Sequence, residues 1–179
     1  YVRNTLIVSL LPVFGQLFSA PMIAYSLTKV PWKGAKYAFP IILATMMIPW
    51  QVTQIPMFAT WAKLGLVNTF VPLTLPSFFG WAYYIYLTRQ FVKGLPDSVI
   101  EAARIDGATF MQKVTRIVFP LVKPTTLFLL VTGVIGSFQV FMNAYMMTGG
   151  GPDNATTMIG LLIYKNAFEY SKFGLACAQ

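Results

Sequence analysis

The chain has 179 residues, of which 56% are hydrophobic, 16% are aromatic and only 10% are charged, and its formal net charge is +8. Soluble domains use charged side chains for about a quarter of their residues, so this composition excludes an ordinary soluble domain. The sequence has no histidine and one cysteine, Cys177. Within this sequence that excludes a zinc or haem site, a Ser-His-Asp triad and an intrachain disulfide. We therefore expect no catalytic residue, no bound metal and no cofactor.

Long runs without a charged residue follow one another along the chain. A helix needs about 20 apolar residues to cross the bilayer core, and each run is long enough. Prolines interrupt the first three runs, but membrane bundles tolerate kinks because neighbouring helices satisfy the freed carbonyl groups. We predict an all-α, polytopic transmembrane helical bundle that forms one domain over residues 1–179. The four predicted spans are about 4–28, 37–60, 68–90 and 124–147.

Most of the basic residues lie in two connections between these runs. Residues 29–36 contain three lysines and no acidic residue, and residues 89–123 contain six basic and three acidic residues. Basic residues accumulate on the cytoplasmic side of a membrane, so both connections should face the cytoplasm. Nucleic-acid binding is the other usual explanation of a basic chain. Here the charges lie beside membrane spans and are not interleaved with exposed aromatics, so no nucleic-acid partner is expected.

The second basic connection contains the charged segment "EAARIDGATF", which begins at Glu101. Ser98 and Glu101 have the spacing of a capping box, and Gly107 can supply the left-handed residue that ends a helix. Ala102 and Ala103 are small, so another protein's backbone can come close to the face on which they lie. These features predict a short helix with a face for a partner.

A second helix is predicted directly after the glycine. Phe110, Val114, Ile117 and Val118 recur with the spacing of an amphipathic helix. The two helices together predict a helix–turn–helix elbow over residues 95–120, lying at the membrane surface. The alternative is a solvated loop that only connects two spans.

Polar residues inside the spans are candidates for a transport pathway, because polar groups that face lipid are costly. Gln139 and Asn143 are four residues apart and would project to one face of a helix. Gln54 lies in the second run and Tyr83 in the third. Planar amides and aromatic faces suit the hydroxyls and the apolar side of a sugar ring. The alternative is that the amides join helices and the tyrosines form an interfacial belt.

The stretch "EAARIDGA" followed by "FPLVKP" resembles the EAA motif of the membrane subunits of bacterial ABC importers, the binding-protein-dependent (MetI-like) permeases. Other stretches resemble the carbohydrate branch of that family, the maltose and glycerol-phosphate type, so that the resemblance covers essentially the whole chain. They are "NTLIVSLL" at 4–11, "MMIPWQVTQIPMF" at 46–58, "LGLVNTF" at 64–70, "LTRQFVKGLP" at 87–96 and "MTGGGPDNAT" at 147–156. They combine features of both permease subunits of such importers, which leaves open the position that the chain fills in the heterodimer.

The resemblance implies a multi-pass subunit of the bacterial inner membrane that forms the pathway for a sugar or sugar-like solute. A non-sugar solute, such as an amino acid, peptide, polyamine or anion, is the alternative. The implied partners are a second permease subunit in a heterodimer, cytoplasmic ATP-binding subunits and an external solute-binding protein, all at a lipid bilayer. The sequence contains no Walker A pattern, so the chain is not expected to be an enzyme and ATP hydrolysis is expected on a partner.

In such importers the elbow is the coupling helix, which docks into a groove of the ATPase subunit. The coupling residues implied here are Glu101, Ala102, Ala103, Asp106 and Gly107. This motif argues strongly against a channel or a regulatory subunit that needs no ATPase.

Comparison with the same family also implies how the two ends are organised. Residues 155–168 would form a short external helix, and residues 173–179 would begin a last span. The sequence is expected to be a fragment that lacks the first span and most of the last.

Overall fold

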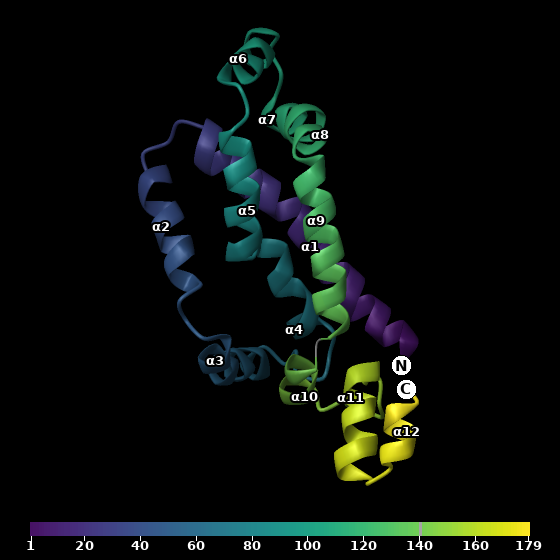
Figure 1. Cartoon of the computed structure of the whole chain (residues 1–179). Helices are drawn as coiled ribbons and strands as arrows, with labels where there is room; N and C mark the ends of the chain where they lie inside the picture. The colour runs from purple at the N-terminus through teal and green to yellow at the C-terminus, as the bar shows by residue number, and fades with distance from the viewer. Residues whose placement is uncertain (140) are drawn as a thin grey trace. The chain divides into compact units, whose positions relative to one another are not determined.

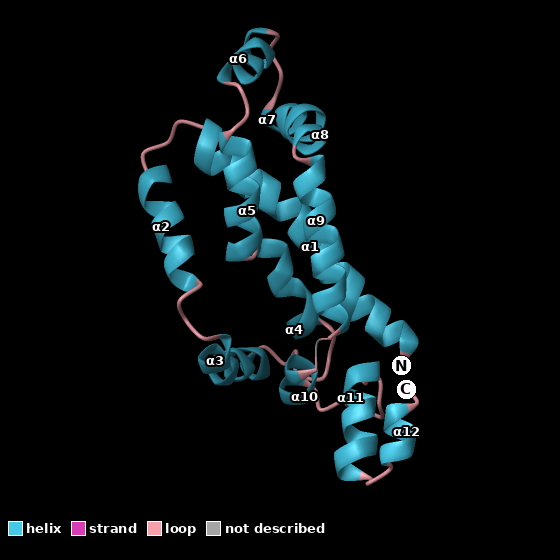
Figure 2. Ribbon diagram, in the orientation of Figure 1, coloured by secondary structure: helices cyan, strands magenta, loops and turns pink. Residues whose placement is uncertain are grey.

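Every regular element that the computed structural model describes, over residues 1–139 and 141–179, is a helix (Figures 1 and 2). The longer helices are α1 (Val2–Lys29), α2 (Ala35–Thr45), α3 (Trp50–Lys63), α5 (Ala82–Lys93), α6 (Asp97–Ile105) and α9 (Lys123–Phe138). The shorter ones are α4 (Val71–Thr74), α7 (Phe110–Lys113), α8 (Phe119–Leu121), α10 (Met142–Met147), α11 (Ile159–Tyr164) and α12 (Phe173–Cys177). A 3₁₀ segment, η1 (Leu75–Phe79), and two π segments, η2 (Val114–Val118) and η3 (Lys165–Glu169), extend their neighbours.

The chain divides into two compact units that do not follow sequence order. Unit 1 comprises Tyr1–Val13, Pro49–Pro76 and Gly133–Gln179, and unit 2 comprises Phe14–Ile48 and Ser77–Thr132. The sequence predicted one domain over residues 1–179. Each unit combines segments that are distant in the chain, so no linker of unusual composition marks the division.

Among the described residues, α1 alone is long and apolar enough to cross a membrane as one helix. Two broken pairs also qualify if each is counted as a single span, namely α2 with α3 and the segment Phe110–Leu121 with α9. The structure therefore has between one and three candidate spans where the sequence predicted four.

Two of the expected spans are not single helices. The run at 37–60 is interrupted before Pro49, where a proline disfavours helical geometry in the preceding residue. The run at 68–90 is divided among α4, η1 and α5, and Gly80 has a φ of +86° at the last division. Local backbone chemistry therefore interrupts the helices within continuous apolar runs.

The core of unit 2 forms where the second half of α1 packs against α5 and the segments that follow the elbow. Its two clusters contain Ala20, Ala24, Tyr25, Leu27, Tyr84, Ile85, Val92, Val114, Val118, Val122 and Leu129. Val114 and Val118 are fully buried and Ile117 is half-buried, while the Phe110 side chain remains 40% exposed. The amphipathic stripe predicted after Gly107 therefore faces this core.

The core of unit 1 joins the start of α1 to α10 and α11. Val8, Ala144, Met158 and Leu161 are buried together there, and Phe141 packs against them.

Aromatic rings extend the core of unit 1 along α11. The Tyr164 ring centroid lies 4.7 Å from that of Phe141 and 5.3 Å from that of Tyr145. The expected external helix at 155–168 corresponds to α11 and most of η3, preceded by loop residues.

The polar side chains of α1 lie on its buried side. Asn4, Ser9 and Gln16 are buried there beside apolar residues such as Val8, whereas Phe14 is exposed. Water would favour the reverse arrangement, but a lipid-exposed face must be apolar and polar groups must be satisfied inside the protein. The composition of α1 is therefore that of a helix whose surroundings are apolar.

Candidate functional site

The charged segment at 101–110 forms the second half of α6, the turn that follows it and the first residue of α7 (Figure 1). The N-cap residue of α6 is Pro96, with no side-chain cap. Because α6 begins at Asp97, Ser98 already lies inside the first turn, and the predicted capping box of Ser98 and Glu101 is wrong. The helix begins earlier because Pro96 has a fixed φ of −57°, which allows it to precede a first helical turn directly.

A capping box does occur in this region, one helix later. The Gln112 backbone N–H donates to the Thr109 hydroxyl at 3.3 Å, and the Thr109 backbone N–H donates to the Gln112 side-chain oxygen at 2.8 Å. This reciprocal pair fixes the start of α7. The signal is present in the sequence as Thr-x-x-Gln immediately after the turn, but this capping box was not predicted.

Gly107 ends α6 as the sequence predicted. Its φ is +74°. The backbone N–H of Gly107 donates to the Arg104 carbonyl at 3.1 Å, and that of Ala108 donates to the Ala103 carbonyl at 2.9 Å. These two bonds form a Schellman motif, in which the residue in the left-handed region is usually glycine. The turn between α6 and α7 is therefore fixed by the backbone of Gly107.

The outward face of α6 differs from the predicted one. Successive residues of a helix are about 100° apart, so Ala102 and Ala103 point in different directions. Ala103 is the one buried residue of α6, and Ile100 packs against the core of unit 2. Ala102 is exposed, and Ile105, three positions later, is 86% exposed. The small outward face is formed by Ala102 and Ile105, and Ile105 was not among the predicted residues.

Charged side chains border this apolar face. Glu101, Arg104 and Asp106 are all exposed. The elbow therefore offers a partner a small apolar centre with a charged rim, which is the usual anatomy of a protein–protein interface.

Two of the four predicted pathway residues contact each other in unit 1. The Gln54 side-chain N–H₂ on α3 donates to the side-chain oxygen of Asn143 on α10 at 3.0 Å. Gln54 is 4% exposed, and its own side-chain oxygen is buried without a hydrogen-bond partner in the described part of the chain. Asn143 is only half-buried. The contact leaves the Asn143 N–H₂ group available for another acceptor.

The other two predicted pathway residues are placed differently. Gln139 follows the end of α9 and is exposed, and Asn143 lies in α10. The expectation that both amides project from one helix is therefore wrong, because α9 ends at Phe138, before Gln139, and Asn143 belongs to α10. Gly136 and Ser137, just before the end of α9, are weak helix formers. Tyr83 belongs to α5 in unit 2, where its ring is 42% exposed and lies edge-on to Tyr84.

A family model described as the binding-protein-dependent transport system inner membrane component matches residues 16–178. The chain belongs to this family. It is thus a membrane component of a transport system, and the family resemblance of "EAARIDGA" is confirmed.

Several transport permeases are similar to the chain. An arabinooligosaccharides transport system permease protein of Halalkalibacterium halodurans is 30% identical over 139 residues, which cover 78% of this chain and 50% of that protein. A trehalose/maltose transport system permease protein of Thermococcus litoralis is 30% identical over 163 residues, covering 77% of this chain and 55% of that protein. A multiple sugar-binding transport system permease protein of Streptococcus mutans is 28% identical over 193 residues, covering 97% and 67%. The chain spans about half the length of the first two of these relatives.

The fold is also found in a solved structure. One chain of the crystal structure of a bacterial ABC transporter involved in the import of the acidic polysaccharide alginate matches with a TM-score of 0.77 and 24% identity. The match covers 99% of this chain and 62% of that one. This match and the family model together confirm the predicted fold class, an all-α bundle of the binding-protein-dependent permease family.

Proposed function

We propose that this chain is a membrane-spanning permease subunit of an ATP-driven importer for a sugar or sugar-like solute. The elbow formed by α6 and α7 couples the chain to a separate ATPase subunit. The observation that carries the proposal is α6 itself, a charged surface helix with a fixed glycine turn in a chain that is otherwise poor in charge. A loop that only connected two spans would need none of these features.

The outward face of α6 supports docking to a protein. Ile105 is 86% exposed, and burying apolar surface contributes about 25 cal/mol per Å². A partner groove that covered Ile105 and Ala102 would gain this energy, while Glu101 and Asp106 at the rim would select a partner with complementary charge. We assign the coupling role to Glu101, Ala102, Ile105, Asp106 and Gly107. Ala103 supports the helix from inside.

The solute assignment rests on uncharged amides and on the relatives. Gln54 and Asn143 form a neutral pair with one free N–H₂ group, which suits a hydroxyl oxygen and supplies no counter-charge for an ion. Relatives named for arabinooligosaccharides, for trehalose/maltose and for multiple sugars support a sugar. A second candidate is a non-sugar solute, because a relative 30% identical to the chain is an osmoprotective compounds uptake permease protein of Synechocystis.

The proposed assembly contains a second permease subunit, cytoplasmic ATP-binding subunits and an external solute-binding protein. The family description, a binding-protein-dependent inner membrane component, supports a location in the bacterial inner membrane with several passes. ATP hydrolysis is assigned to the partner, because this sequence contains no Walker A pattern. The elbow and residues 29–36 would face the cytoplasm, and the loop at 148–155 would face outward.

The test uses the full-length chain, produced with the transport subunits encoded beside it and reconstituted into vesicles. Uptake of radiolabelled arabinooligosaccharide, maltose and trehalose is measured together with ATP hydrolysis. Glu101→Lys should abolish both uptake and the stimulation of hydrolysis by solute, while the chain still inserts. Glu169→Lys is the matched control, because it makes the same change on an exposed residue of η3. Normal uptake and stimulation in the Glu101 variant would refute the coupling role.

A further inference from the structure

Lys29, the last residue of α1, is a charged side chain that is almost completely covered. Its side chain is 7% exposed. The ammonium donates to the Leu95 carbonyl at 2.7 Å and to a carboxylate oxygen of Asp97 at 2.6 Å. Over residues 1–139 and 141–179 this is the one ion pair, and it joins positions 68 residues apart in the chain. The contact ties the end of α1 to the start of α6.

The local fields favour this pair on both sides. Lys29 lies in the last turn of α1, where the helix dipole favours a cation, and Asp97 lies in the first turn of α6, where it favours an anion. A covered ammonium must be paired and hydrogen-bonded. The Leu95 carbonyl and Asp97 meet this need. Asp97 is 79% exposed, but the Lys29 ammonium is covered and also bound by the Leu95 carbonyl, so this contact differs from a pair in which solvent screens both groups.

Few other contacts hold α6 in place. Ala103 is its one buried residue, and Ile100 is half-buried against the core. A solvent-open cavity of about 560 Å³ lies between α6 and the end of α1, and its lining includes Lys29, Glu101 and Arg104. Beyond the turn, the Phe110 ring centroid lies 5.5 Å from that of Tyr25. Packing thus attaches α6 weakly, and Lys29 fixes its N-terminal end.

We propose that Lys29 is a positioning residue that makes α6 and α1 move together. When the ATPase displaces α6, α1 then moves with it. Without the contact, α6 could shift into the open space beside the end of α1 while α1 stayed in place. The inference rests on the proposed function, because it has meaning only if α6 is the coupling helix.

The experiment measures solute transported per ATP hydrolysed in vesicles that contain the full-length chain and its partner subunits. Lys29→Met keeps the stem of the side chain and removes the charge. Lys29→Arg keeps a charged donor. Lys33→Met is the matched control, because Lys33 is exposed in the connection that follows α1.

Losing charge-assisted hydrogen bonds of this kind shifts an equilibrium by about tenfold or more. Lys29→Met should lower the transport-to-hydrolysis ratio by about this factor while the ATPase subunits still copurify with the chain. Lys29→Arg and Lys33→Met should keep a normal ratio. Asp97→Asn should cause a smaller loss, because the Leu95 carbonyl still accepts from Lys29. A normal ratio in Lys29→Met overturns the inference.

If Lys29→Met does not accumulate in the membrane, Asp97→Lys tests the positioning role of Lys29 instead. Asp97 is 79% exposed, so the larger side chain is accommodated, and a second ammonium beside Lys29 must lower the ratio. A normal ratio in this variant also overturns the inference. Glu101→Lys separates the two proposals. If it leaves coupling intact, the proposed function fails, whereas if it uncouples transport and the Lys29 and Asp97 variants do not, only the positioning role fails.

Discussion

Gly107 shows how one residue can set the direction of the elbow. Its φ of +74° lies in the left-handed region, and no heavy atom lies within 4 Å of the place where a Cβ would be built. Substitution therefore meets no steric obstacle from neighbouring residues. Any effect must come from the backbone conformation, which costs about 1–2 kcal/mol for an ordinary residue and is worse for a β-branched one.

We expect Gly107→Val to change the turn and to reduce solute-stimulated ATP hydrolysis by about tenfold, since about 1.4 kcal/mol corresponds to a factor of ten. Gly107→Asn is the control, because asparagine visits the left-handed region more readily. Hydrolysis by the reconstituted transporter is measured for both variants. Equal losses in the two variants would show that the left-handed backbone is not the cause.

The Gln54–Asn143 hydrogen bond allows a test between substrate contact and simple helix packing. Asn143→Ala should raise the apparent KM for sugar several-fold, because a lost hydrogen bond costs about 0.5–1.5 kcal/mol. Gln54→Ala should have a smaller effect, which is not additive with the first because the two side chains touch. Gln51→Ala, an exposed amide on the same helix, should leave KM unchanged. If the first two variants lower thermal stability and leave KM unchanged, the pair only packs the helices together.

At the residue scale, the sequence predicts features that depend on the backbone of one residue. It does not predict features that depend on contacts with residues elsewhere in the chain. Gly107 could be predicted because a positive φ strongly favours glycine. Ile105 was missed because exposure is a property of the packed helix. The contact between Gln54 and Asn143 joins positions 89 residues apart, and no local pattern in either helix announces it.

At the scale of elements, the start of α1 holds a loop in place. The Asn4 side-chain N–H₂ donates to the carbonyls of Ala155 and Thr157 at 2.8 and 3.0 Å. The Ile159 backbone N–H donates to the Thr5 hydroxyl at 3.0 Å. These bonds attach the glycine-rich loop and the start of α11 to α1. The loop has positive φ angles at Gly149, Gly150, Asp153 and Asn154, and the bonds to α1 add to those within the loop.

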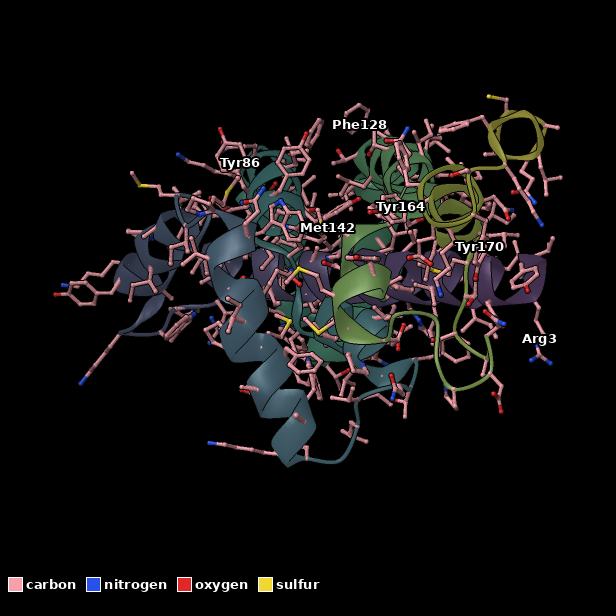
Figure 3. All side chains as sticks on the ribbon, turned by 90° about the horizontal axis from the view of Figure 1, so that it is seen from below. Arg3, Tyr86, Phe128, Met142, Tyr164 and Tyr170 are labelled. Carbon is pink, nitrogen blue, oxygen red and sulfur yellow. The ribbon has the colours of Figure 1, made fainter. Side chains whose placement is uncertain are left out.

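Asn4→Ala should destabilise the protein by about 1–3 kcal/mol, because it leaves two carbonyl groups without their donor. The expected result is a lower thermal midpoint in detergent and faster protease cleavage after the loop at 148–155. Arg3→Ala is the matched control on the neighbouring exposed residue (Figure 3). An unchanged midpoint and unchanged cleavage would mean that the loop is ordered without Asn4.

Apolar runs predicted the helical elements but not their interruptions. A run without charged residues indicates that a segment avoids water. It does not indicate whether the segment forms one helix or several. Prolines at 49, 72 and 76 and the left-handed Gly80 lie at or near the divisions. Proline and glycine indicate where a break is possible, but packing decides which of them interrupt the helix, since Pro40 and Pro56 lie inside α2 and α3.

At the scale of the whole molecule, the division into two units was beyond sequence patterns. Unit 1 takes its residues from three separate segments and unit 2 from two. The family and the all-α class could be predicted because they are carried by a local motif and by overall apolarity, respectively. The grouping of segments depends on long-range contacts.

The orientation in the membrane is the property of the whole molecule that charge alone predicts. In a Cys177→Ser background, Lys33→Cys should react with a membrane-impermeant maleimide only after the cells are opened, because the lysine-rich connection stays in the cytoplasm. Asp153→Cys should react in intact spheroplasts. Both positions and Cys177 are exposed, so burial does not hide them from the reagent, and the Cys177→Ser chain without a new cysteine is the blank. The reverse labelling pattern would place α6 outside the cell, where it could not meet an ATPase, and the coupling role of the elbow would fall with it.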